Sequence, residues 1–419
     1  TLTQSELGLL FGDRTTCPFL RPHMLARSQY SQISYAAETI AEAAERFVSA
    51  ALQDDKILSL LDLTEREASL ARIEPGYSSL CVSSRLDTFI DGDDFKFLEY
   101  NAETPAGVGD QHHLESLLFR IPAVKAFLGI NEYSRTRPQQ KLLESLVRGY
   151  REFGGKETKP NIAIVDWDGV STGAEFESLK DFFESMGFRT LIVDPKDIEY
   201  NGRELYAGNF RIDIFYKRIV IHEYLDAFDD GHALIQGYSD GNVFMANSFR
   251  VKIAHKKSSF AVLTDEKYAS LFTTEQQAII RKHLPWTRKV TDAATTYFGD
   301  SVETLEFIRK NREKMLLKPN DDYGGKGIVM GWEVDAGEWD DAIENALSES
   351  FVVQERAAIK KETFPFYDTT ARLTDLHVDF DPFLFLNKVE GGMVRLSASS
   401  LVNVTQGGGQ TALVVLEDF

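Results

Sequence analysis

The sequence is poor in cysteine and has no long run of apolar residues. Its 419 residues include only two cysteines, Cys17 and Cys81, which are too few for a disulfide framework and fit a reducing cytosol. No stretch of about 18 consecutive apolar residues is present, so we expect no membrane span. The first residues lack a charged segment ahead of an apolar core, which predicts no signal peptide. We therefore expect a cytoplasmic protein.

Positive charge is also scarce. The chain has 46 lysines and arginines against 65 aspartates and glutamates, a formal net charge of −19. Nucleic-acid phosphates repel such a surface, so we expect no nucleic-acid partner, and any bound anion must be held locally. Hydrophobic residues make up 43% and charged residues 26% of the chain, which is usual for a globular protein with a large core. The length predicts two or three domains.

The most unusual segment is the glycine-rich stretch 315-MLLKPNDDYGGKGIVMG-331. An apolar strand ends at Lys318, a polar loop carries Gly-Gly-Lys-Gly at 324–327, and a second apolar strand follows. Because glycines let backbone N–H groups approach an anion and the two lysines add positive charge, the segment predicts a phosphate cradle. It matches neither G-x-x-x-x-G-K-[ST] nor a G-x-G-x-x-G that opens a helix. The alternative is a tight β-hairpin with glycines at its turn.

The pattern of apolar residues predicts a mixed α/β or α+β fold. Residues 161–167, 173–188 and 190–194 form a predicted β-α-β unit, which we interpret as a Rossmann-like support lobe. The remaining predicted elements are helices over 35–53, 139–153 and 337–348, strands over 212–221 and 351–357, and strands separated by glycine turns over 377–416.

A predicted hairpin over 85–105, with its turn at Asp91–Asp94, carries polar residues in alternation. Alternate side chains of a strand share a face, so Glu99 and Asn101 project together, and Asp87 with Arg85 beside it lies on the preceding strand. Hard oxygen ligands at this spacing suit a divalent cation, and Mg²⁺ is the natural candidate. The alternative is a solvated hairpin edge with scattered polar residues.

These motifs together carry a resemblance to a known family. The pattern R-x-D, eleven residues, E-x-N over Arg85 to Asn101 resembles the magnesium site of glutathionylspermidine synthetases and of the wider circularly permuted ATP-grasp proteins. The segments 255-HKKSSFAVL-263 and 395-RLSASSLVNVTQGGG-409 are similar to further family segments. The metal strand precedes the glycine loop, as in the permuted branch. The resemblance implies ATP and Mg²⁺ as cofactors and three regions: 1–135 with helices and the metal hairpin, 136–250 as the Rossmann-like lobe, and 251–419 as the ATP-binding lobes with the glycine-rich flap.

The resemblance also implies a role for individual residues. Three oxygen-bearing side chains would hold one or two Mg²⁺ ions: Asp87, Glu99 and Asn101. Two lysines would contact the phosphates of ATP: Lys257 and Lys318. The flap over the β- and γ-phosphates would consist of Gly324, Gly325, Lys326 and Gly327.

Four further residues receive roles by the same resemblance. Gln354 and Glu355 sit where the family's interlobe strand meets adenine, and Arg85 would face an acyl phosphate. Arg395 would bind a substrate carboxylate or a phosphate, although an arginine on a late strand often makes only a surface ion pair. Lys257 and its neighbour Lys256 have the alternative of a solvated basic pair.

The implied reaction is that of an ATP-dependent carboxylate–amine ligase. A carboxylate attacks the γ-phosphorus of ATP, and an amine then displaces phosphate from the acyl phosphate to form an amide. The partners would be a small-molecule or peptide carboxylate and an amine, with glutathione and spermidine as candidates. Two alternatives stay open: a small-molecule kinase on the same ATP site, and a nucleotide-binding regulator without turnover.

Several other polar residues receive structural interpretations. The histidines lack metal-ligand spacing with any cysteine, so packing or surface roles are expected for His112, His113 and His377. Asp379 and Asp381 alternate along a strand and form either a second metal pair or an exposed face. Nothing in the sequence orients Cys17 and His23 as a thiol–imidazole pair.

Overall fold

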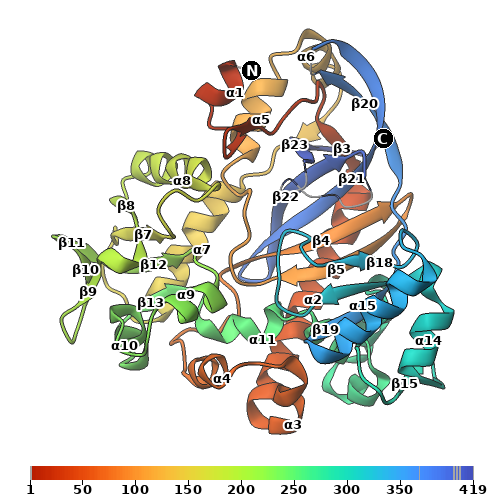
Figure 1. The fold of residues 1–419 in the computed structure, drawn as a ribbon. Coiled ribbons are helices and arrows are strands. Elements are labelled where there is room, and N and C mark those ends of the chain that lie inside the picture. Colours follow the sequence, from red (N-terminus) through yellow and green to blue (C-terminus); the bar gives the residue numbers. More distant parts are fainter. Residues whose placement is uncertain (1, 368, 400–401, 403, 405–406, 419) are drawn as a thin grey trace.

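A computed structural model describes residues 2–367, 369–399, 402, 404 and 407–418 (Figure 1). It contains several small sheets, with helices packed between and around them, and a mixed α/β fold is thereby confirmed. None of the helices in these ranges combines the length and apolar character that crossing a bilayer requires.

The central sheet joins strands from opposite ends of the chain. The hairpin β4 (Ser83–Asp91) and β5 (Asp94–Asn101) is present as predicted, with Gly92 at its turn in the left-handed region at a φ of 66°. Strand β4 pairs with β21 (Ala371–Phe385), and β22 (Lys388–Ser397), β23 (Gly409–Thr411) and β20 (Lys361–Tyr367) complete the sheet. The early hairpin and the late strands therefore lie side by side, although about 300 residues separate them.

The expectation of glycine turns throughout 377–416 is wrong for β21 and β22. These strands are joined by Leu386–Asn387, both at positive φ, and the pair Gly391–Gly392 lies inside β22. A Cβ atom at Gly392 would lie 2.4 Å from the ring of Phe380 and 2.5 Å from the carbonyl oxygen of Asp381. This glycine thus permits close packing of the two strands, which is a use of glycine that a turn pattern does not distinguish.

A parallel sheet forms the Rossmann-like lobe. Its strand order is β13 (Phe244–Ala246), β12 (Ile214–Lys217), β7 (Ile162–Val165) and β8 (Thr190–Val193), and α8 (Gly173–Ser185) connects the last two. The predicted β-α-β unit is confirmed. Helix α7 (Pro138–Glu152) packs on β12 and β13.

The single strand predicted over 212–221 is wrong at both ends. Strand β11 (Phe210–Ile212) belongs to a separate small sheet, β12 ends at Lys217, and α9 (Ile221–Ala227) begins at Ile221. The backbone N–H of Ile221 donates to the carboxylate of Glu103 at 2.8 Å, so a distant side chain satisfies the start of a helix there. The apolar run continues across this change of conformation, and periodicity alone does not reveal it.

A third sheet carries the glycine-rich loop. Its order is β14 (Thr287–Lys289), β19 (Phe351–Glu355), β17 (Met315–Pro319) and β18 (Val329–Met330), and α15 (Ala336–Ser348) packs on β17 and β19. The loop therefore connects two antiparallel neighbours, as both interpretations of the sequence required.

The longest helix, α2 (Arg27–Gln53), lies against the strands β21 and β22 and begins eight residues before its predicted start. Its buried face is rich in alanine, which allows close approach of its neighbours. A further sheet joins β3 (His23–Ala26), β24 (Leu413–Leu416) and β6 (Tyr133–Ser134). The remaining helices of eight or more residues in the described ranges are α4 (Glu65–Arg72), α5 (Gln111–Leu118) and α13 (Thr274–His283).

Shorter elements connect these parts. The remaining helices are α1 (Leu2–Glu6), α3 (Asp55–Leu58), α6 (Pro122–Leu128), α10 (Ala233–Ser239), α11 (Lys252–His255), α12 (Ser258–Leu263), α14 (Thr304–Lys310) and short 3₁₀ turns. The remaining strands are β1 (Leu10–Phe11), β2 (Arg14–Thr15), β9 (Ile198–Tyr200), β10 (Leu205–Ala207), β15 (Ala294–Tyr297) and β16 (Asp300–Glu303).

Candidate active site

The hairpin residues predicted to bind a metal lie together in the structure. Asp87 is directly opposite Glu99, and Arg85 is opposite Asn101. The side-chain amide of Asn101 donates to Asp87 at 2.8 Å and to Glu99 at 3.2 Å, so both carboxylates converge on this side chain. Burial acts to raise the pKa of Glu99, but the ammonium of Lys257, 3.6 Å away, holds it below its usual range. This set of ionised carboxylate and amide oxygens fits the ligands that Mg²⁺ prefers.

Two guanidiniums and two further carboxylates surround Asp87. Arg395 extends from β22, and its Nη2 lies 2.8 Å from Asp87, 2.7 Å from Asp379 and 2.9 Å from Asp381. Arg85 donates to Asp87 through Nε at 2.9 Å. We call these five residues the arginine–carboxylate cluster.

The cluster overturns two alternatives left open by the sequence. Asp379 and Asp381 are fully buried, so they form no exposed face, and the side chain of Arg395 is 7% exposed, so it makes no surface ion pair. Burial raises the pKa of Asp379 to about 6 despite the opposing charge of Arg395. The signal for this arrangement was the alternation of Asp379 and Asp381, because it places both on the face that Arg395 shares across the β21–β22 pair.

A cavity of about 620 Å³ lies between the cluster and the sheet that carries the glycine loop. Leu316, Ile328 and Met330 give it an apolar wall, and Lys318, Gln354 and Glu355 add polar groups. Its other wall includes Asp87, Glu99 and Arg395. An apolar wall beside cationic and carboxylate groups is suited to a ligand with a flat ring and a charged tail.

Four of the predicted nucleotide contacts line this cavity: Lys318, Gly325, Gln354 and Glu355. Lys318 donates to the side-chain oxygen of Gln354 at 2.8 Å. Gln354 in turn donates to Thr287, so its amide is fully engaged and holds the lysine in place. Burial lowers the pKa of Lys318 to about 8, although Glu99 opposes the shift. Glu355 accepts a hydrogen bond from Tyr297 at 3.0 Å.

The glycine loop spans the mouth of the site. Gly324, Gly325 and Gly327 have φ values of 70°, 77° and 70°, in the left-handed region that other residues rarely adopt. A Cβ at Gly327 would also lie 2.7 Å from Pro319. The Lys326 side chain is 81% exposed, and its one ion pair within the described part of the chain is with Asp322, at 3.9 Å. The backbone thus has the conformation that the glycine pattern predicts, while Lys326 extends into solvent.

A second cavity, of about 310 Å³, meets the first at the cluster. Both cavities are lined by Asp87, Glu99 and Arg395. Gly324 lines the second cavity and Gly325 the first, so the loop extends across their junction. Arg85 and Asn101 face the second cavity.

The profile of a family described as a circularly permuted ATP-grasp matches residues 84–354 of the chain. The chain belongs to the circularly permuted ATP-grasp family. The expected fold is thereby confirmed, and membership in an ATP-grasp family implies ATP binding. Neither the comparisons nor the structure tests the more specific resemblance to glutathionylspermidine synthetases.

Relatives of this ATP-grasp chain are distant. It is 24% identical over 340 residues to an uncharacterized protein of Mycobacterium tuberculosis, an alignment that covers 77% of this chain and 58% of the mycobacterial protein. It is 26% identical over 269 residues to a Frankia alni protein named "Putative glutamate–cysteine ligase 2-3", covering 60% of this chain and 29% of that protein. The chain therefore spans a little more than half of the mycobacterial protein and less than a third of the Frankia alni protein.

A solved structure of similar fold is a glutathione synthetase-like effector, GSS30, from Globodera pallida. The TM-score is 0.66 at 13% identity, with 99% of this chain and 94% of the effector covered. At this identity the likeness describes the fold, and it extends over nearly the whole ATP-grasp chain.

Sequence reasoning missed a second set of buried charges beneath the loop. Lys252 of α11 is 2.8 Å from Glu103 and 2.7 Å from Asp321, and Lys256 is 2.5 Å from Asp321 and 3.2 Å from Glu67. We call these five residues the loop-root network, because Asp321 stands at the start of the glycine loop. Lys256 is 4% exposed, so the interpretation of a solvated basic pair is wrong.

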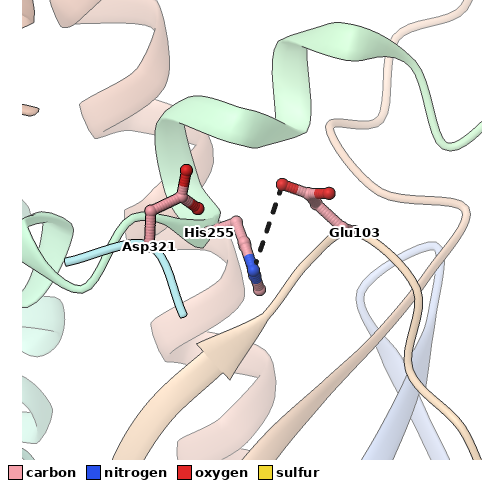
Figure 2. Close-up of side chains that lie close together, drawn as sticks. All are labelled: Glu103, His255 and Asp321. Atoms are coloured by element: carbon pink, nitrogen blue, oxygen red, sulfur yellow. Dashed lines mark ion pairs between the residues drawn. The ribbon is translucent and has the colours of Figure 1, made fainter. Parts of the chain in front are cut away.

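The same region contains a histidine close to two carboxylates. Figure 2 shows the side chains of Glu103, His255 and Asp321, which come from the end of β5, from α11 and from the glycine loop and lie close together. The Nε2 atom of His255 lies 3.9 Å from Glu103. The ammonium of Lys252 already bonds Glu103 and Asp321, in the place where a metal ion would lie between them. Burial lowers the pKa of His255, so this ring is neutral at physiological pH. We therefore interpret this group as an anchor for the loop.

Lys257 connects the glycine loop to the β4–β5 hairpin. Its backbone N–H donates to the carbonyl of Asn320 at 2.9 Å, and its side chain donates to the carbonyl of Asp322 and lies 3.6 Å from Glu99. Lys257 therefore links the base of the glycine loop to Glu99, which lines both cavities. Within the segment 395–409, residues 400, 401, 403, 405 and 406 lie outside the described residues.

Proposed function

We propose that the chain is an ATP-dependent carboxylate–amine ligase. An oxygen of the substrate carboxylate attacks the γ-phosphorus of ATP, the bond from that phosphorus to the β-γ bridging oxygen breaks, and ADP leaves. The amine nitrogen then attacks the carbonyl carbon of the acyl phosphate. The bond from that carbon to the phosphate oxygen breaks, the nitrogen gives up a proton, and an amide and inorganic phosphate result.

The observation that supports this proposal is the junction of the two cavities. A ligase of this kind must bring a triphosphate and a carboxylate together in one place and shield the acyl phosphate from water. The first cavity suits the nucleotide, because an apolar wall leads toward Lys318 and Glu99. The second suits the substrates, and Asp87, Glu99 and Arg395 are common to both.

The residues at the junction have charges suited to this reaction. Lys318 and Lys257 would offset the negative charge of the phosphates, and the glycine loop would offer backbone N–H groups to them. Asp87, Glu99 and Asn101 would hold Mg²⁺, which when bound neutralises phosphate charge. Arg85, fixed by Asp87 and by the carbonyl of Ala106, would face the acyl phosphate from the second cavity.

The substrates are proposed from the relatives. The name of the Frankia alni relative specifies two amino acids, glutamate and cysteine, as the compounds that are joined. We therefore propose that amino acids or short peptides supply the carboxylate and the amine here. The name of the Globodera pallida effector includes the words "glutathione synthetase" and points to the same class of compounds.

The test is a screen for ADP release. The full chain, ATP and Mg²⁺ are combined with a matrix of amino acids, dipeptides and amines, and the products are identified by mass spectrometry. We expect ADP release that requires both an acid and an amine, with a product heavier by their sum less water. A phosphorylated product would favour a kinase instead. ATP binding without ADP release from any pair would contradict turnover.

The matched variant for the screen is Lys318→Ala. We expect most ADP formation to be lost, because the buried ammonium lines the cavity proposed for the nucleotide, while circular dichroism remains that of the unchanged chain. Unchanged turnover would remove Lys318 from the site.

A further inference from the structure

Arg218 follows directly on strand β12 of the parallel sheet and lines the second cavity. Ligands of open α/β sheets bind outside the carboxyl ends of the strands, which is where this side chain lies. Its side chain is 3% exposed. A guanidinium buried to this degree needs a partner for each of its N–H groups, because an unpaired one carries a desolvation cost.

The hydrogen bonds of Arg218 leave one edge of the guanidinium open. Its Nη1 donates to the carbonyl of Pro105 at 2.6 Å and to the hydroxyl of Tyr216 at 3.3 Å. Its Nε has no hydrogen-bond partner within the described part of the chain. The nearest carboxylate to Nη2 is that of Glu175 at 3.7 Å, beyond hydrogen-bond distance. The Nε–Nη2 edge, which carboxylates bind through two parallel hydrogen bonds, is therefore buried beside the cavity without a hydrogen bond to the described part of the chain.

The carboxylate of Glu175 is already engaged elsewhere. Its Oε1 accepts from the backbone N–H of Gly107 at 2.9 Å and of Gly109 at 3.4 Å. Glu175 therefore shapes the loop that forms the cavity wall, and it balances the charge of Arg218 from a distance without occupying its open edge.

The other two guanidiniums of the cavity differ from Arg218 in this respect. Arg85 donates through Nε and Nη2 to Asp87, and Arg395 donates through Nε and Nη2 to Asp379. Their bidentate edges are thus occupied by carboxylates of the protein. Among the cavity's three arginines, Arg218 is the one whose Nε has no hydrogen-bond partner in the described part of the chain.

We propose that Arg218 binds a second, non-reacting carboxylate of a substrate through its Nε–Nη2 edge. The reacting carboxylate must lie at the cavity junction, beside Asp87 and Glu99, and Arg218 lines only the second cavity. Arg218 and Arg85 bond the neighbouring carbonyls of Pro105 and Ala106, so the two guanidiniums flank one stretch of cavity wall. The substrate class is therefore a dicarboxylate, or an amino acid or peptide with a free carboxylate. This inference rests on the proposed function and specifies its substrate.

The first test measures binding without turnover. Glutarate and its monoamide differ by one carboxylate, and their dissociation constants are measured by calorimetry on the full chain and on Arg218→Met. We expect the unchanged chain to bind glutarate at least tenfold more tightly than the monoamide, and Arg218→Met to lose this preference. Equal binding of both probes by the unchanged chain, no measurable binding of glutarate, or an unchanged preference in Arg218→Met would each overturn the proposal.

Two further variants separate binding from folding. Arg218→Met leaves the buried Glu175 uncompensated, so the double variant R218M/E175Q removes both charges and is expected to fold while still lacking the preference. Arg211→Met is the matched control, since Arg211 is a half-buried arginine of the same lobe that pairs with Glu157 and Asp213 outside both cavities. It is expected to keep the preference. Arg218→Lys retains the charge without the fork and is expected to show an intermediate preference.

The second test uses a substrate pair from the ADP-release screen. We expect Arg218→Met to raise the KM of the carboxylate-bearing substrate at least tenfold, with little change in kcat or in the KM of ATP. A fall in kcat with unchanged KM would overturn the assignment. If no pair releases ADP while glutarate still binds through Arg218, the proposed reaction fails and the carboxylate site stands, so the two failures are distinguishable.

Discussion

The arginine–carboxylate cluster and the loop-root network are built from the same kinds of residue, yet they differ in what they face. Each places three carboxylates around two basic side chains, and most of these side chains are nearly inaccessible to solvent. The cluster opens through Asp87 and Arg395 into both cavities. The network instead packs around Lys252, which is completely buried and pairs with a residue at the start of the glycine loop, and of its five residues Glu103 alone lines a cavity, the second one.

This difference separates a reactive site from an anchor. A carboxylate that faces a cavity can exchange its protein partner for a ligand. A carboxylate paired with a buried ammonium instead contributes to the stability of the folded state. Glu99 has a side chain that is 27% exposed, while that of Glu103 is 1% exposed. We therefore expect substitutions in the network to affect stability and substitutions at the cavity junction to affect turnover.

The largest expected effect is on stability, for Lys252→Met. Removing the ammonium leaves Glu103 and Asp321 without their shared partner, and breaking a buried pair in this way costs about 3–5 kcal/mol. The measurement is the midpoint of thermal unfolding. Lys196→Met is the control, because its ammonium is exposed and its pairing with the exposed Asp168 is expected to contribute little to stability. Equal midpoints for the two variants would remove the distinction between anchor and site.

The second largest effect is expected for Glu99→Gln, and it is an effect on turnover and not on stability. The substitution keeps the shape of the side chain but removes a charged ligand, so we expect ADP release to fall about 100-fold, equivalent to about 2.7 kcal/mol, with an unchanged unfolding midpoint. Asp91→Asn, at the exposed turn of the same hairpin, should retain full activity. A large loss of stability in Glu99→Gln would show that this carboxylate is also an anchor.

Part of the candidate site was predictable from the sequence alone. The β4–β5 hairpin and the glycine loop were predictable because each is a local pattern: R-x-D and E-x-N on two adjacent strands, and glycines at positions that require positive φ. In a local pattern, the spacing along the chain determines how the residues lie relative to one another.

The partners of these motifs were not predictable, because they depend on pairing between distant segments. Arg395 is 308 residues from Asp87, and Lys252 is 69 residues from Asp321. Asp379 and Asp381 were recognised as a pair, but their burial depends on β21 lying between β4 and β22. Arg218 carried no sequence signal, since its significance comes from an open edge in a cavity formed by three parts of the chain.

A smaller effect is expected from pH, through Lys318. Burial lowers its pKa to about 8, so the side chain loses its positive charge as the pH rises through this value. If the charge holds phosphate, kcat/KM for ATP is constant below pH 8 and falls by up to tenfold per pH unit above it. Lys318→Arg remains charged across this range, and its profile should lack the descending limb. The same limb in both proteins would assign it to another group.

The smallest effect is expected for Lys326→Ala, and it tests how the exposed part of the loop differs from its root. The side chain of Lys326 is 81% exposed and lies 3.9 Å from Asp322. Removing its charge should therefore leave the unfolding midpoint unchanged. An exposed lysine near phosphate is screened by solvent, and we expect the KM for ATP to rise only about two- to fivefold. That difference should shrink as ionic strength increases, because salt screens exposed charges more than buried ones. If the variant instead loses as much activity as Lys318→Ala, the lysine must become buried when ATP binds, and the loop would then close over the nucleotide as a flap.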